Sequence, residues 1–170
     1  MSRPPRSNPD QDVVDQLIRD WARERPDLDT SAMAVVGRLL HLGGVLQTRA
    51  NDRLREHGIS YTELDVLATL RRSGAPYRLS PTELRKSVLL SSGAMTACLN
   101  RLEQRQLIFR STDDADRRSL MATLTPQGVA LIDEAIAAHF NAAGQAVGGL
   151  DRDERVELAR LLRKFRLQLE

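Results

Sequence analysis

Residues 80–124 read SPTELRKSVLLSSGAMTACLNRLEQRQLIFRSTDDADRRSLMATL, and this stretch decides the fold. Ser80 is a favoured N-cap residue, and Glu83 follows it at the spacing of a capping box. Pro81 suits the first helical position, where its missing N–H leaves no hydrogen bond unmade. These signals predict a helix from Pro81 to about Ser87.

A second helix is predicted after the apolar connector 88–90, because Ser91, Ser92 and Gly93 are small residues that favour a helix start. Its apolar stripe consists of Met95, Cys98, Leu99 and Leu102. The opposite face is small and polar, which suits a helix laid in the major groove of DNA. DNA contacts are predicted on both helices and on the turn that follows them, at Thr82, Ser91, Ser92, Gly93, Thr96, Asn100, Arg101, Arg117 and Arg118.

Two short strands, 107–110 and 119–124, are predicted next, around a charged turn. The turn carries Arg117 and Arg118, and adjacent arginines at a hairpin tip can reach phosphates or a minor groove. Between Arg78 and Leu124 there are eight basic and five acidic residues, although the whole chain has a formal charge of only +2. The basic excess thus lies on the segment expected to neutralise phosphates.

Helical patterns continue on both sides of this stretch. They predict helices from the Asn8 cap to Arg25, over 31–57 with Gly58 as C-cap, over 60–73, from Pro126 to Val147 and from Asp151 to the end, with a short strand at 77–79. Ser60 and Glu63 have the spacing of a capping box at the start of the helix 60–73. Residues 1–7 are predicted to be a disordered tail and residues 8–170 a single domain. Within it, 8–58 and 126–170 form a helical dimerisation region, because their apolar surface exceeds what one copy can cover, and 60–124 form the DNA-binding lobe.

Composition excludes several classes of protein. Hydrophobic residues at 41% and charged residues at 28% of 170 are typical of one soluble globular domain. The start of the chain lacks a signal sequence and no run approaches a membrane span, so a cytoplasmic protein without membrane contact is expected. A lone cysteine excludes an internal disulfide, and His41, His57 and His139 lack metal-ligand spacing. We found no catalytic motif, so neither an enzyme nor a cofactor is expected.

The stretch 79–128 resembles the MarR (multiple antibiotic resistance regulator) family. The resemblance rests on the Ser-Pro-Thr-Glu-Leu start, the Ser-Ser-Gly-Ala-Met-Thr segment, the Asp-Arg-Arg turn and the Leu-Thr-Pro-Gln-Gly exit. Members are bacterial winged-helix repressors that bind DNA as homodimers. The resemblance implies a mainly α fold with a small β-wing (α+β), a winged helix-turn-helix with an extra N-terminal helix and a helical dimerisation region.

Trp21, Asp65 and Arg110 form a second predicted site. Each has a structural explanation by itself, but together an aromatic ring, a carboxylate and a guanidinium suit a flat, anionic heterocycle. Over nearly its whole length the chain resembles the urate-responsive branch of the family, the HucR and PecS type, which implies urate, a related purine or a phenolic compound as effector. In this branch Asn-Arg follows the threonine, whereas here Ala97 and Cys98 follow Thr96. The lost cation predicts weaker urate binding or a less charged effector.

Three points stay open at this stage. Arg101 has two interpretations, a phosphate contact or an ion pair with an acidic neighbour, Glu103 or Asp113. Without effector, Asp65 and Arg110 are expected to pair with each other and hold the DNA-binding conformation. The alternatives to an effector-controlled repressor are a regulator triggered by oxidation of Cys98, and an architectural or protein-docking module that binds DNA without sequence preference.

Overall fold

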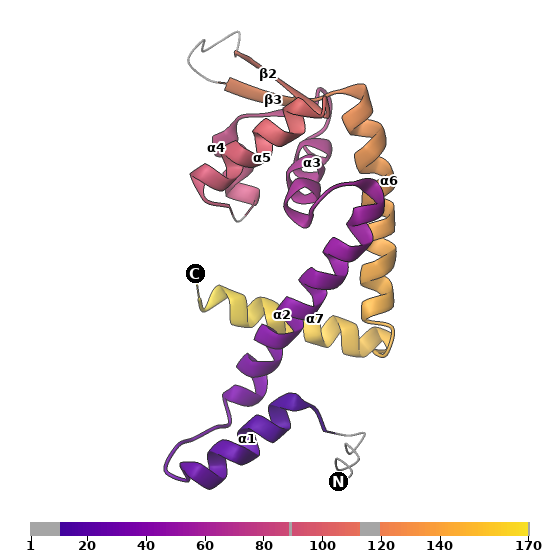
Figure 1. Ribbon diagram of the computed structural model, residues 1–170. Coiled ribbons are helices and arrows are strands. Elements are labelled where there is room, and N and C mark those ends of the chain that lie inside the picture. The colour runs from indigo at the N-terminus through magenta and orange to yellow at the C-terminus, as the bar shows by residue number, and fades with distance from the viewer. Residues whose placement is uncertain (1–10, 89, 113–119, 170) are drawn as a thin grey trace, which may run out of the picture. The chain divides into compact units, whose positions relative to one another are not determined.

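The computed structural model describes residues 11–88, 90–112 and 120–169, and the chain divides into two compact units, residues 1–48 and 49–170. Helices dominate, with one small antiparallel sheet (Figure 1), as the sequence predicted. No helix in the described ranges is long and apolar enough to span a membrane. The predicted tail 1–7, the proposed cap Asn8, and Arg117 and Arg118 lie outside the described residues.

The first unit contains α1 (Val13–Glu24) and the first part of α2 (Met33–Leu54). The prediction that α1 starts after Asn8 is wrong, because the helix begins at Val13 with Asp12 as its N-cap. The Asp12 carboxylate accepts hydrogen bonds from the backbone N–H groups of Val14 and Asp15, at 2.8 and 3.0 Å. Arg38 of α2 donates to Asp12 at 2.8 Å and to Asp15 at 2.7 Å. These ion pairs join α1 to α2.

The second unit contains the end of α2 and the winged-helix lobe. The lobe has the predicted order of helix, strand, two helices and hairpin. Its elements are η1 (Arg55–His57), α3 (Tyr61–Arg72), β1 (Arg78–Leu79), α4 (Pro81–Ser87), α5 (Ser92–Gln104), β2 (Ile108–Thr112) and β3 (Leu120–Leu124), followed by α6 (Pro126–Ala146) and α7 (Arg152–Leu167). Gly58 ends the α2 and η1 segment in the left-handed conformation, with φ 66°, as predicted for a C-cap.

The sheet has the order β1-β3-β2, and all neighbours are antiparallel. Arg78 pairs with Thr123, while Ile108 pairs with Leu124. Arg78 also reaches across the sheet, because its Nη2 donates to the carbonyl of Thr112 at 3.1 Å. The hairpin β2–β3 is therefore attached to the strand that precedes the two short helices.

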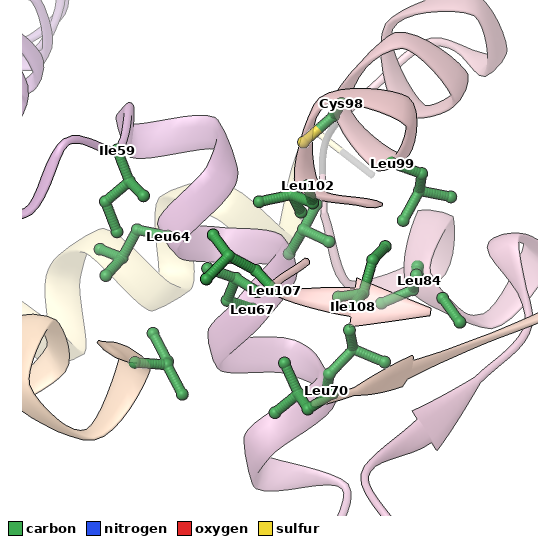
Figure 2. Close-up of a cluster of buried hydrophobic side chains, with 14 of the residues drawn as sticks. Ile59, Leu64, Leu67, Leu70, Leu84, Cys98, Leu99, Leu102, Leu107 and Ile108 are labelled. Atoms are coloured by element: carbon green, nitrogen blue, oxygen red, sulfur yellow. The ribbon is translucent and has the colours of Figure 1, made fainter. Parts of the chain in front are cut away.

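One apolar core holds the lobe together. Figure 2 shows Cys98, Leu99 and Leu102 of α5 pointing into the same cluster as the leucines of α3 and α4. The stripe predicted for this helix, Met95, Cys98, Leu99 and Leu102, is buried throughout. Burying four side chains on one face fixes the rotation of α5 and leaves its opposite face in solvent.

The motif Leu-Thr-Pro-Gln-Gly forms a tight corner at the start of α6. The Thr125 hydroxyl donates to the Gln106 carbonyl at 2.7 Å and accepts from the N–H of Gly128 at 3.0 Å. A Cβ at Gly128 would lie 2.0 Å from the carbonyl oxygen of Leu107. Only glycine therefore permits this approach of α6 to the segment that joins α5 to β2.

Large apolar side chains remain exposed outside the lobe. In α7 no residue is buried, and apolar side chains exposed in this part of the chain are Phe140, Val147, Val156, Leu158, Leu161, Leu162, Leu167 and Leu169. In the first unit Leu40 is 71% exposed and Val35 56%. So much uncovered apolar surface is unusual for a monomer.

Candidate nucleic-acid interface

Local capping sets where the two short helices begin. Ser80 N donates to the Glu83 carboxylate at 2.8 Å, and Glu83 N donates to Ser80 Oγ at 3.2 Å. The Ser91 hydroxyl accepts from Ala94 N at 3.3 Å and starts α5. The sequence predicted both starts, because an N-cap depends on residues within one turn of each other.

The predicted DNA-contacting residues within the described ranges all lie on the exposed surface of the lobe: Thr82, Ser91, Ser92, Gly93, Thr96, Asn100 and Arg101. Nothing lies within 4 Å of the Cβ that a side chain at Gly93 would add. Packing within the chain therefore does not require glycine there. A close approach by an external backbone, such as that of DNA, would require it.

Arg101 has a partner that the sequence interpretation did not consider. Its Nε donates to Glu63 of α3 at 3.3 Å, rather than to the predicted partner Glu103. The other predicted partner, Asp113, lies outside the described residues. Burial acts to raise the pKa of Glu63, but hydrogen bonds from Ser60 and Arg101 outweigh it and lower the pKa overall. Glu63 is therefore a carboxylate at neutral pH.

The expected ion pair between Asp65 and Arg110 is not formed, and that prediction is wrong. Arg110 of β2 pairs instead with Glu103 of α5, through its Nε at 2.8 Å and through its Nη2. The backbone N–H of Arg110 donates to the same carboxylate at 3.1 Å. The reason is that β2 folds back along the end of α5, which brings Glu103 beside Arg110. The pairing attaches the wing to the end of α5.

Asp65 is half-buried on α3. Desolvation raises the pKa of its carboxyl group, although the nearby charges of Arg72 and His139 act to lower it. Within the described ranges its carboxylate makes no hydrogen bond or ion pair. The ring centroid of His139 on α6 lies 5.8 Å from that of Tyr61, and the two rings are tilted by 57°. Tyr61 lies one turn before Asp65 on α3. A half-buried carboxylate without a partner is typical of a binding residue.

Trp21, the third predicted effector residue, lies on α1 in the first unit and is 50% exposed. A large aromatic ring with half its surface in solvent is available to stack on a ligand. It is the single tryptophan of the chain.

Cys98 has the environment of an unreactive thiol. It is buried in the core, and desolvation together with the charge of Glu63 raises the pKa of its thiol to about 11. Because the thiolate is the reactive form, this position opposes oxidation. No group of three or more metal-ligating side chains occurs in the part of the chain that the structure describes.

Sequence reasoning missed the roles of Glu63 and Gly128. Glu63 was recognised only as the capping partner of Ser60, and nothing in the sequence distinguishes it from the exposed capping residue Glu83. Gly128 was quoted only as part of the motif that resembles the family. The motif spacing is the one sequence signal that marks it.

Comparison with protein families finds that residues 57–119 match a model described as MarR family. The transcriptional regulator PecS of Dickeya dadantii is 33% identical over 149 residues, which cover 88% of this chain and 90% of PecS. Among solved structures, BpsR of Bordetella bronchiseptica, whose DNA binding is regulated by 6-hydroxynicotinic acid, is 29% identical with a TM-score of 0.62. The match covers 75% of this chain and 98% of BpsR.

The fold also matches Sco3205, a MarR family transcriptional regulator from Streptomyces coelicolor whose structure was solved in complex with DNA. The TM-score is 0.75 at 23% identity, over 84% of this chain and 94% of Sco3205. The chain is thus similar to winged-helix regulators over most of its length.

Proposed function

This chain belongs to the MarR family of DNA-binding transcriptional regulators, which are not enzymes, and we propose that it is a repressor released from its operator by a small planar anion. The observation that carries the proposal is the two-sided character of α5. Its apolar stripe is buried, and its small polar face, with Thr96 and Asn100, is exposed. This arrangement leaves a rigid helix with a face that fits a major groove.

We propose that the protein acts as a homodimer. The exposed apolar side chains of α7 and of the first unit support this, because a second copy would cover them. Two recognition helices related by a two-fold axis would require half-sites about 34 Å apart. The operator is then expected to be a pseudo-palindrome, located in the promoter region of the gene that encodes this chain.

We propose that Trp21, Asp65 and Arg110 bind the effector. Two observations support a flat heterocycle. The Asp65 carboxylate is half-buried and makes no hydrogen bond or ion pair to any described residue. DNA binding of BpsR, a similar protein, is regulated by 6-hydroxynicotinic acid, a planar aromatic anion. The same residue types suit urate, related purines and phenolic acids. A carboxylate can accept from a ring N–H, and a guanidinium can pair with the anionic group.

The ion pair of Arg110 with Glu103 suggests how release would occur. An effector anion that binds Arg110 must compete with Glu103, which belongs to the recognition helix α5. Loss of this ion pair would detach the wing from α5. The effector releases DNA only if it binds the detached form better, and such coupling is typically about 1–3 kcal/mol.

A gel-shift and footprint experiment on the DNA flanking the gene tests the repressor function. We expect one protected pseudo-palindrome, with release by at least one compound among urate, xanthine, 6-hydroxynicotinic acid and phenolic acids. Uniform, salt-sensitive coating of every fragment would instead support the architectural module.

Replacing Asp65 with asparagine tests the effector site. We expect Asp65→Asn to raise the effector concentration that releases half of the DNA by at least about 10-fold, with operator affinity kept within an order of magnitude. Asp65 has a raised pKa in the fold, so ionisation is disfavoured there relative to the unfolded chain, and the neutral side chain should leave the melting temperature unchanged or higher. Fluorescence quenching of Trp21 measures effector binding directly.

Asp52→Asn removes an exposed carboxylate on α2 and is the control. The variant Arg110→Ala is less informative, because it also removes the ion pair with Glu103. If Asp65→Asn responds to the same effector concentration as the wild type, Asp65 does not bind the effector.

A further inference from the structure

Glu63 is more deeply buried than its capping function requires. Its carboxylate accepts from the N–H and the hydroxyl of Ser60, at 2.8 and 3.0 Å, at the start of α3. The equivalent capping carboxylates Glu83 of α4 and Glu154 of α7 are exposed. The side chain of Glu63 is only 8% exposed. Burying a charge in this way costs free energy unless other charged groups compensate it.

Arg101 of the recognition helix and Arg105, the residue that caps its C-terminal end, supply that compensation. Arg101 Nε donates to Glu63 Oε1 at 3.3 Å, and Arg105 Nη1 lies 4.0 Å from Glu63 Oε2. The side chain of Arg101 is 53% exposed, and its two Nη groups form no hydrogen bond within the described ranges. Glu63 therefore holds Arg101 by one edge of the guanidinium, while more than half of the arginine side chain stays exposed.

We propose that Glu63 is a positioning residue for DNA recognition, which holds Arg101 through Nε so that its Nη groups meet a phosphate beside the groove occupied by α5. The inference rests on the proposed operator binding. A free arginine side chain has many rotamers and loses them when it binds a phosphate, whereas one already held by a carboxylate loses fewer. Because phosphate contacts set the position of a protein on the duplex, this ion pair would fix how α5 lies in the groove.

The variant Glu63→Gln separates capping from positioning. To keep its bond with Ser60 N, the glutamine must turn its oxygen toward Ser60, and its NH₂ then faces Arg101, donor against donor. We expect operator affinity to fall about 10-fold. Affinity for unrelated DNA should stay within about two-fold, because the charge of Arg101 remains. Glu154→Gln changes an exposed capping residue in the same way and should leave both affinities unchanged.

A double-mutant cycle distinguishes positioning from a general loss of structure. Glu63→Gln is expected to cost nothing further in an Arg101→Ala background, because its effect passes through Arg101. Arg101→Ala should also lower the slope of log affinity against log salt concentration by roughly 2 for the dimer, one phosphate per protomer. Additive losses, or wild-type operator affinity for Glu63→Gln, would overturn the proposal.

Glu63 is buried, so Glu63→Gln could impair folding, whereas Arg101 is exposed and its replacement should not. Arg101→Lys therefore tests the same proposal independently of the fold. A lysine has a single ammonium group and cannot bind Glu63 and a phosphate through opposite edges of a fork. We expect about the same 10-fold loss of operator affinity, and wild-type affinity would again overturn the proposal. If the wild-type protein itself fails to bind the operator, the proposed repressor function fails first and the inference fails with it.

Discussion

Gly128→Ala is expected to destabilise the protein by about 3 kcal/mol or more, at the upper end of the range for overpacked sites. The added Cβ would lie 2.0 Å from the carbonyl oxygen of Leu107, and both groups belong to backbone that cannot move aside alone. Either α6 or the segment between α5 and β2 must shift. For a chain of this size the melting temperature should fall by roughly 6–12 °C, measured by circular dichroism.

Gly144→Ala on the same helix is the matched control. Nothing lies within 4 Å of a Cβ at Gly144, so alanine should stabilise α6 by up to about 1 kcal/mol through its higher helix propensity. Equal melting temperatures for the two variants would mean that the close approach at Gly128 does not exist in solution. The same experiment bears on the proposed function, because Leu107 lies three residues beyond the end of α5.

The double variant Thr96→Ala and Asn100→Ala is expected to lower operator affinity by about 100-fold or more. Both residues lie on the exposed face of α5, and each side chain that reads a base contributes about 1–3 kcal/mol of discrimination. The fold should tolerate both changes, because exposed substitutions of this kind alter stability by about 0.5 kcal/mol or less. Competition gel shifts against unrelated DNA measure the change in specificity.

Affinity for unrelated DNA should remain nearly constant in this double variant, since non-specific binding depends on phosphates rather than on base edges. Gln104→Ala, at the exposed end of the same helix, is the control and should bind the operator as the wild type does. Equal losses on operator and unrelated DNA would show that the outward face of α5 does not read sequence.

The sequence predicted the elements of the lobe well because their signals are local. The capping boxes at Ser60 and Ser80, the proline at the start of α4 and the apolar stripe of α5 act within one or two turns of helix. Each is satisfied in the structure as predicted. The resemblance of the stretch 79–128 to the MarR family is confirmed by the family model and by the similarity to PecS.

The first helix shows where local signals stop being sufficient. Asn8 with Pro9 and Asp12 with Asp15 are both acceptable helix starts in the sequence. In the structure the N-cap is Asp12, and its carboxylate also accepts a hydrogen bond from Arg38 of α2. The helix start that the structure uses is thus the one supported by a contact between residues 26 positions apart in the sequence.

By itself, the sequence determined the order and ends of the helices in the lobe, the buried stripe of α5 and the family, because these depend on residue spacing along the chain. Only the tertiary structure decided which acid holds which arginine: Glu63 for Arg101, and Glu103 for Arg110. Arginine side chains are long and flexible, so each can reach several acidic residues. The spacing of residues along the sequence does not determine which of these becomes the partner. Folding selects among them by bringing α3 and β2 against α5, which buries Glu63 and leaves the carboxylate of Asp65 without a hydrogen bond or ion pair among the described residues.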